Sequence, residues 1–306
     1  MSAHIAAAFE QARNPRVVGA PHPGLRPLLA RGYSGYDAGA APHDHMVRPA
    51  TASVSLILKI CDSALRPPAF VNGGHDRCAV IEGPCAPSYL EVRLAPLGAY
   101  TILGVPMSEV SARLVDLGEL LGGDSDRLLE QVRAAPSWGR RFQTVDRYLL
   151  RRAQDGPRPA AAVSFAWQRL LTSSGTVPIK SIAADVGWSH KHLIAKFRQQ
   201  AGLPPKTVAR LVRFNRLLAC LDRSALPDWH QIAAECGYAD QAHLARDFRE
   251  FTGTTPTGFV DGSRPADRAH DVRDHLIPLD HVPPAGQRLI AFKTGRDGRP
   301  YGAQRV

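Results

Sequence analysis

The feature of this 306-residue sequence that most constrains its fold is a motif that occurs twice between residues 178 and 259. Apolar residues three or four positions apart on both sides of a glycine predict a helix, a tight turn and a second helix in each copy. Equivalent residues lie 50 positions apart before the turn and 51 after it, so one copy has a single extra turn residue. The first copy contains Ile182, Gly187, Leu193, Phe197, Gly202 and Pro205, and the second contains Ile232, Gly237, Leu244, Phe248, Gly253 and Pro256.

The start of each second helix supports this prediction. Ser189 in the first copy and Asp240 in the second stand where an N-cap is needed, because their side-chain oxygens can accept a free backbone N–H. Each second helix also carries a leucine and a phenylalanine four residues apart, which we expect to face the core. These pairs are Leu193 with Phe197 and Leu244 with Phe248. The other faces of these helices are therefore left to solvent.

A further helix is predicted between the two copies, from Lys206 to Leu221, where Arg210, Arg213 and Arg216 are interspersed among apolar residues. A helix of this length spans roughly 24 Å at about 1.5 Å per residue. With half a motif added at each end, it could hold the two second helices about 34 Å apart, as successive major grooves of DNA require.

Positive charge is concentrated in the same part of the chain. The whole sequence has 38 Lys and Arg against 28 Asp and Glu, a formal net charge of +10. Residues 156–260 hold 13 basic and 7 acidic residues, whereas residues 1–150 hold 15 and 14. A basic segment favours a polyanionic partner, although a solvated basic surface would have the same composition.

Cysteine usage and hydropathy indicate the compartment. The cysteines are odd in number and include no Cys-x-x-Cys pair, which favours a reducing environment. No signal-peptide pattern and no apolar run of 18 residues occurs in the sequence. We therefore expect a cytoplasmic protein that does not enter the membrane.

The N-terminal half shows strand patterns followed by helical ones. Short β-branched or alternating runs between Gly and Pro clusters predict strands at 53–61, 78–81 and 89–94. Apolar periodicity predicts helices at 108–121, 138–152 and 160–172. We expect an α+β protein, with a small cupin-like β-barrel or sandwich and helices in the N-terminal half and an all-helical C-terminal half.

Composition shifts then divide the chain. We expect a poorly structured N-terminus at 1–24, an N-terminal domain at 25–153, a linker at 154–160, a helical domain at 161–260 and a largely disordered extension at 261–306. The helix predicted at 138–152 carries an apolar stripe of Phe142, Val145, Leu149 and Leu150. This stripe can pack against the β domain or form a dimer seam, and we favour packing.

An enzymatic or metal-binding interpretation has little support. His43, His45 and His75 could serve as zinc or iron ligands, but their spacing favours loop or structural roles. The sequence has no Gly-rich phosphate loop, nucleophile elbow or His-Glu-x-x-His motif. We therefore expect no catalytic activity, no metal and no cofactor.

The segment from about residue 160 to 260 resembles the DNA-binding domain of the AraC/XylS family of bacterial transcription regulators. A single helix-turn-helix is a weak signal, whereas two at this spacing, joined by an Arg-rich helix, are specific. The residues that carry the resemblance are Ile182-Ala183-x-x-Val186-Gly187-Trp188-Ser189, Cys236-Gly237-Tyr238-x-Asp240-Gln241, Arg246-x-Phe248 and Gly253-Thr254-Thr255-Pro256.

This resemblance implies which residues contact DNA. The base-reading residues would be His190, Lys191, Ile194 and Ala195 in the first copy and Gln241, Ala242, Ala245 and Arg246 in the second. Phosphate contacts would come from Ser189, Lys196, Arg198, Asp240 and Arg249. Many relatives have Arg where this chain has Ala195, which implies that the first copy discriminates less between bases.

The N-terminal half resembles, more loosely, the sensory half of some AraC-type regulators. Its cues are Leu25-Arg26-Pro27, Gly32-Tyr33-x-Gly35-Tyr36, Val92-Arg93-Leu94, Leu103-Gly104-Val105-Pro106 and Arg141-Phe142. This resemblance implies a regulatory role and names no ligand. Aromatic residues that could line an effector pocket, or simply fill a β core, are Tyr33, Tyr36, Phe70, Tyr89 and Tyr100.

Together the two resemblances imply a regulator that reads two successive major grooves of double-stranded promoter DNA and is modulated by an effector or partner. RNA polymerase, a small-molecule effector and a second copy of the chain are the implied partners. The alternative is a ligand-binding sensor or scaffold with only incidental affinity for DNA. Its signature would be tight ligand binding with no sequence preference in selected DNA.

Overall fold

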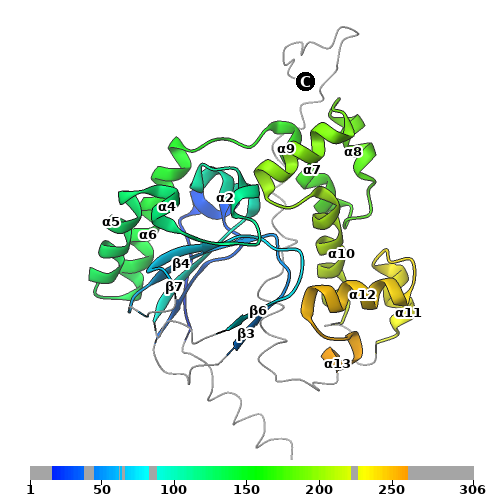
Figure 1. The fold of residues 1–306 in the computed structure, drawn as a ribbon, viewed down its shortest axis with the longest axis horizontal. Coiled ribbons are helices and arrows are strands. Elements are labelled where there is room, and N and C mark those ends of the chain that lie inside the picture. The colour runs from blue at the N-terminus through cyan, green and yellow to red at the C-terminus, as the bar shows by residue number, and fades with distance from the viewer. Residues whose placement is uncertain are drawn as a thin grey trace, which may run out of the picture.

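The computed structural model describes residues 16–37, 45–61, 63, 66–82, 88–221 and 227–260. The predictions for residues 1–15 and 261–306, and the candidate ligand His43, lie outside the described residues. The predicted fold class is confirmed, because β-sheets and helices form the N-terminal half and only helices follow residue 156 in the described chain (Figure 1).

The N-terminal half contains two antiparallel sheets. The larger has six strands in the order β1-β2-β7-β4-β5-β8, and the smaller pairs β3 with β6. The helix η1 lies between β1 and β2, and the other helices of this half follow β7, with β8 between α3 and α4. The strands are β1 (Arg16–Gly19), β2 (Tyr33–Tyr36), β3 (His45–Arg48), β4 (Val54–Lys59), β5 (Ala69–Asn72), β6 (Ala79–Glu82), β7 (Tyr89–Leu94) and β8 (Leu114–Asp116). The helices are η1 (Pro23–Leu28), α2 (Pro96–Leu103), α3 (Met107–Val110), α4 (Leu117–Leu121), α5 (Gly123–Ala134) and α6 (Trp138–Asp155).

The two faces of the larger sheet differ in chemistry because side chains alternate along each strand. One face is apolar: Leu56 pairs with Val92 and Leu58 with Leu90, and these side chains are fully buried in the N-terminal core. Phe142, Val145 and Leu149 of α6 belong to the same core, while Leu150 is half-buried at its edge. The stripe on α6 therefore packs against the β domain.

Two predictions for this half are wrong. The sequence predicts a poorly structured N-terminus at 1–24, but β1 pairs with β2 along its whole length. It also predicts one helix over 108–121, where the structure has α3, β8 and α4. Ala112 has φ 55°, a value that interrupts a helix. After this break Asp116 pairs with Phe70, so β8 joins the sheet as an edge strand.

The C-terminal half repeats its helices as the sequence predicts. The helices α8 and α11 have seven residues each, and α9 and α12 have twelve. The linker is slightly shorter than predicted, because α6 continues to Asp155. The helices are α7 (Ala161–Thr172), α8 (Ile179–Asp185), α9 (His190–Ala201), α10 (Pro205–Leu221), α11 (Trp229–Glu235), α12 (Gln241–Thr252) and α13 (Pro256–Val260).

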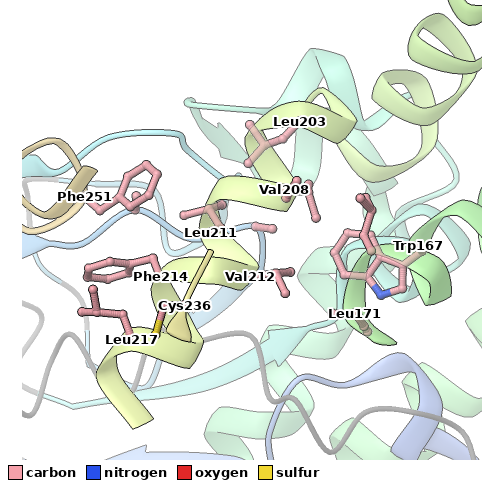
Figure 2. Packing of buried hydrophobic residues seen from close by; sticks show 14 of the residues in the cluster. Trp167, Leu171, Leu203, Val208, Leu211, Val212, Phe214, Leu217, Cys236 and Phe251 are labelled. Atoms are coloured by element: carbon pink, nitrogen blue, oxygen red, sulfur yellow. The ribbon is translucent and has the colours of Figure 1, made fainter. Parts of the chain in front are cut away.

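The helix α10 joins the two motifs into one body. It runs from the region of α8 and α9 to that of α11 and α12 (Figure 1). Figure 2 shows Trp167 and Leu171 of α7 on one side of α10 and Phe251 of α12 on the other. All of these side chains lie in a single hydrophobic cluster, so the two motifs share a core. Among the described residues, no helix has the length and apolar character needed to cross a membrane.

Candidate nucleic-acid interface

The turns of the two motifs have the same backbone geometry. Gly187 has φ 68° and Gly237 has φ 76°, in the left-handed region that glycine adopts without a steric penalty. The next residue of each turn closes it with the same hydrogen bond. The amide of Trp188 donates to the carbonyl of Ala183, and that of Tyr238 donates to Ala233, both at 2.9 Å. The extra residue of the second copy therefore follows this common turn.

The second helices, α9 and α12, which are the recognition helices if the protein reads DNA as predicted, are capped at their starts as predicted. The hydroxyl oxygen of Ser189 accepts a hydrogen bond from the amide of His192 at 3.2 Å. The carboxylate of Asp240 accepts one from the amide of His243 at 2.7 Å. These contacts satisfy one of the free N–H groups at the start of each helix and fix the direction in which it leaves the turn.

The side of each second helix that packs inward is also as predicted. Leu193, Phe197, Leu244 and Phe248 are all at most 1% exposed. The predicted base-reading residues lie on the remaining surface. His190, Lys191, Ala195, Gln241, Ala242 and Arg246 are exposed, and Ile194 and Ala245 are half-buried. Of the predicted phosphate-binding residues, Ser189, Arg198, Asp240 and Arg249 are exposed and Lys196 is half-buried. Their contacts with DNA stay predictions.

The helix α12 is held by a contact that α9 lacks. The guanidinium of Arg210, on α10, lies 2.7 Å from an oxygen of Asp247 and 2.6 Å from an oxygen of Glu250, both on α12. The same group lies 4.9 Å from the centre of the Phe251 ring. The positions of α9 equivalent to the two acids are Lys196 and Gln199, which hydrogen-bond to each other. Among the residues that the structure describes, ion pairs tie α12, but not α9, to α10.

The environment of Arg210 keeps this contact charged. Burial by itself would lower the pKa of the Arg210 guanidinium, but hydrogen bonds to Glu250 and Asp247 outweigh it and raise the pKa. The Asp247 side chain is only 2% exposed, and its second oxygen has no hydrogen-bond partner within the described chain. Asp247 therefore depends on Arg210 for compensation of its buried charge.

The N-terminal domain contacts the end of α12 through backbone hydrogen bonds. The amide of Ala50 donates to the carbonyl of Phe251 at 2.9 Å, and the amide of Cys78 donates to that of Glu250 at 2.7 Å. Both carbonyls belong to the last turn of α12, where no intrahelical donor is available. Ala50 follows β3 and Cys78 precedes β6, so one end of the small sheet caps the second recognition helix.

The N-terminal domain also packs against the end of α9. The helices α2 and α3 contact α9, and a side chain at Gly202 would approach the Ser111 hydroxyl to 2.6 Å. Gly202 ends α9 with φ 88°, so both the backbone conformation and the close approach require glycine. Both recognition helices thus touch the N-terminal domain at their C-terminal ends.

Three of the five aromatic residues predicted for an effector pocket share one face of the larger sheet. Tyr36, Phe70 and Tyr89 lie on the second, more polar face of the larger sheet, and the rings of Tyr36 and Tyr89 stack at 4.5 Å. Tyr33 points to the opposite face, where it is buried and donates a 2.6 Å hydrogen bond to Asp146. Tyr100 lies on α2 beside the N-terminal core.

The polar face also carries a buried charged network that sequence reasoning misses. Arg48 of β3 donates a 3.2 Å hydrogen bond to Ser55, and Ser55 donates one of 2.8 Å to Glu91. Arg93 pairs with the same carboxylate at 3.0 Å. Alternating hydrophilic residues on short strands hint at such a face, but the partners come from strands far apart in the sequence. The network connects the larger sheet to the small sheet that caps α12.

The histidines form no metal site in the described part of the chain. His75 is 8% exposed, and its Nδ1 lies 3.3 Å from the carbonyl of Gly73. Burial lowers the pKa of His75, and the nearby Arg48 lowers it further, so the ring is neutral at neutral pH. No group of three His, Cys, Asp or Glu side chains arranged to bind a metal occurs among the described residues.

Comparisons with known proteins address the C-terminal half most directly. Residues 182–261 match a family model described as a helix-turn-helix domain. No curated protein matches the chain in sequence. The C-terminal domain of AraT, a response regulator from Geobacillus stearothermophilus, aligns at 22% identity over 33% of this chain and 84% of its own, with a TM-score of 0.31.

Longer alignments link the chain with ToxT from Vibrio cholerae. One ToxT structure aligns at 12% identity over 71% of this chain and 88% of its own, with a TM-score of 0.34. Wild-type ToxT with bound unsaturated fatty acid aligns at 9% identity over 71% and 93%, with a TM-score of 0.33. These TM-scores do not establish a common overall arrangement. The family match and the two helix-turn-helix motifs carry the identification: residues 182–261 form a helix-turn-helix domain of the AraC type, a type of domain that binds DNA in transcription regulators.

Proposed function

We propose that the protein regulates transcription by placing α9 and α12 in two successive major grooves of promoter DNA. The observation that carries this proposal is the shared core around α10, which holds two equally capped recognition helices with their outer faces exposed. The 17 residues of α10 span roughly 25 Å, which leaves room for one helical turn of DNA between the motifs.

The two helices would read DNA unequally. Arg246 can donate two hydrogen bonds to guanine, and Gln241 can pair with adenine in the same groove. The equivalent positions of α9 are Ala195 and His190. The first copy would therefore depend on Lys191 and on apolar contact between Ile194 and thymine methyl groups. Most of the sequence preference would come from the second copy.

The phosphate contacts at the helix starts would use the backbone. The carboxylate of Asp240 has only acceptor oxygens and already accepts the amide of His243. A phosphate near this residue would instead be bound by the other free N–H groups at the start of α12. Ser189 can still donate its hydroxyl proton to a phosphate while its oxygen caps α9. Arg198 and Arg249 would supply the charged phosphate contacts of the two copies.

The N-terminal domain would modulate this reading through the two contacts on the recognition helices. An effector bound on the polar face, beside Tyr36, Phe70 and Tyr89, would lie on the sheet that contains the Arg48 network. A shift of β3 would move Ala50, whose amide caps α12. The position of α12 relative to α9 would then change, and with it the fit to two grooves.

Selection of DNA bound by the purified full-length protein, followed by footprinting of the selected sequences, tests the reading mode. We expect two conserved segments about one helical turn apart, with stronger base preference in the segment bound by α12. A protected stretch shorter than one turn would exclude the two-groove mode. No enrichment at all would favour the alternative of a sensor or scaffold with incidental DNA affinity.

The variants Cys78→Pro and Cys78→Ala test the modulation by the N-terminal domain. Cys78→Pro removes the amide that donates to Glu250, whereas Cys78→Ala keeps it. With folding verified by circular dichroism, we expect only Cys78→Pro to alter affinity for DNA that carries both segments. Equal behaviour of the two variants would show that this hydrogen bond does not influence reading.

A further inference from the structure

The outer side of the N-terminal domain has a groove between α5 and α6 that DNA reading does not use. Two adjoining hollows of about 730 and 190 Å³ share the side chains of Gln131, Thr144 and Arg147. The smaller hollow lies between the stripes 124–131 of α5 and 144–151 of α6. Residues on these stripes recur every three or four positions, so each helix presents one continuous edge to the groove.

The groove is basic. Four arginines line it, against the carboxylates of Asp124 and Asp146. Asp146 is already engaged, because one of its oxygens accepts hydrogen bonds from the Tyr33 hydroxyl and the His22 amide. Asp124 lies 3.7 Å from one arginine and 3.5 Å from another, distances typical of weak surface pairs. The arginines are Arg127, Arg140, Arg147 and Arg151.

Two of these arginines have neutral partners only. Arg147 donates to the hydroxyl of Thr144 at 3.4 Å, and Arg140 donates to the side-chain oxygen of Gln143 at 3.2 Å. Neither has a carboxylate within ion-pair distance in the described part of the chain. A planar guanidinium in such a position can still donate a pair of hydrogen bonds to an oxyanion.

The strongest indication of a ligand is the buried hydroxyl of Tyr148, a residue that lines the smaller hollow. Tyr148 is 7% exposed, and its hydroxyl has no hydrogen-bond partner among the described residues. Burial raises the pKa of Tyr148, so the hydroxyl keeps its proton and can donate it. The guanidinium of Arg151 lies 5.5 Å from the centre of the same ring. A buried donor without an acceptor costs free energy that an oxyanion between Tyr148 and the arginines would recover.

We propose that the α5–α6 groove is a binding site for a small oxyanion, a phosphate or carboxylate group, held by Arg147, Tyr148 and Arg151. The site is separate from the polar face of the sheet and from both recognition helices, so it does not depend on the mode of DNA reading. The remaining arginines would attract the anion and limit its escape along the groove.

The test is hydrogen exchange of the full-length protein with inorganic phosphate or acetate, at an ionic strength kept constant with chloride. We expect saturable protection of peptides from residues 123–152. Protection by phosphate alone would identify a phosphoryl site, and protection by acetate alone a carboxylate site. No saturable protection in this segment with either anion would overturn the proposal.

Matched variants separate specific binding from general attraction to a basic protein. Arg147→Gln and Tyr148→Phe should each weaken the protecting anion roughly tenfold, the loss that removal of one charge-assisted hydrogen bond produces. Tyr148→Phe should unfold no more readily than wild type without anion, because it removes a donor that has no partner. The control Arg113→Gln, on an exposed loop of the same domain, should bind as wild type does. Equal effects of all three variants would also overturn the proposal.

Discussion

The two recognition helices have nearly the same backbone and different supports. Both are twelve residues long, both begin at a side-chain cap and both end at a left-handed glycine. However, α12 is bound to α10 by the Arg210 ion pairs and to the small sheet by two backbone hydrogen bonds, whereas α9 packs against its neighbours and accepts one hydrogen bond at Gln200, from the Ala160 amide. The helix with the richer set of predicted base-reading side chains is thus also the one with the larger number of polar contacts to the rest of the protein.

The largest expected effects are losses of stability from substitutions at equivalent buried positions of the two copies. Phe197→Ala and Phe248→Ala each remove a fully buried ring from the same structural position. Each should lower the free energy of unfolding by about 3 to 5 kcal/mol, measured by urea denaturation. The exposed neighbours Arg198→Ala and Arg249→Ala should stay within about 0.5 kcal/mol of wild type. A much smaller loss of stability for one variant than for the other would show that the two phenylalanines are not structurally equivalent.

The next effect should separate the copies. Arg210→Met leaves Asp247 buried without a cation, and we expect a loss of about 3 kcal/mol in the free energy of unfolding. Hydrogen exchange should rise in α12 and not in α9. Arg216→Met, at a half-buried position on the same helix, is the control and should cost about 1 kcal/mol or less. Equal exchange in both recognition helices would mean that the ion pairs do not restrain α12 selectively.

Substitutions at the predicted base-reading positions should have a smaller effect, limited to DNA binding, that differs between the two copies. Arg246→Ala should cost about 1 to 3 kcal/mol in binding to selected DNA and relax the preference at one base position. The reciprocal change Ala195→Arg should add a preference in the segment read by α9. Competition with single-base variants of the site measures both. If Arg246→Ala weakens all sequences alike, Arg246 contacts phosphate instead of a base.

The smallest expected effect, on the salt dependence of DNA binding, should be the same for the two copies. Arg198 and Arg249 occupy equivalent exposed positions near the ends of α9 and α12. Replacement of either by Ala should reduce the slope of log affinity against log salt by about one unit. Titration of DNA binding over a range of salt concentrations gives this slope. An unchanged slope for one of the two variants would remove its arginine from the phosphate-binding set.

How far the sequence predicts the fold depends on how long each pattern runs. The long helix α10 and the duplicated motifs lie within a residue or two of their predicted positions, because each contains several turns of apolar periodicity. The short strands β1 and β8, of four and three residues, carry too few alternations to be identified, although the four-residue strand β6 lies one residue from its predicted position. Leu114 shows the consequence: it continues a helical spacing in sequence, but it lies in β8 and is 42% exposed.

The candidate site shows the same limit at the level of single residues. The outward faces of α9 and α12 follow from the spacing of their buried partners. The role of Arg210 does not, because its acidic partners lie 37 and 40 positions away and nothing local marks them. The hydrogen bonds from Ala50 and Cys78 to α12 are formed by backbone atoms, so the identity of the side chains does not predict them.

The capping of α12 by Ala50 and Cys78 has a thermodynamic consequence. DNA would bind the exposed face of α12, while the small sheet holds its last turn, so a displacement of the helix by either partner changes the free energy of the other. Linkage requires this coupling to be reciprocal. If a ligand changes the affinity for DNA through the small sheet, then bound DNA must change the affinity for that ligand by the same factor. Bound to its promoter, the protein would then respond to a different range of ligand concentrations than it does free in solution.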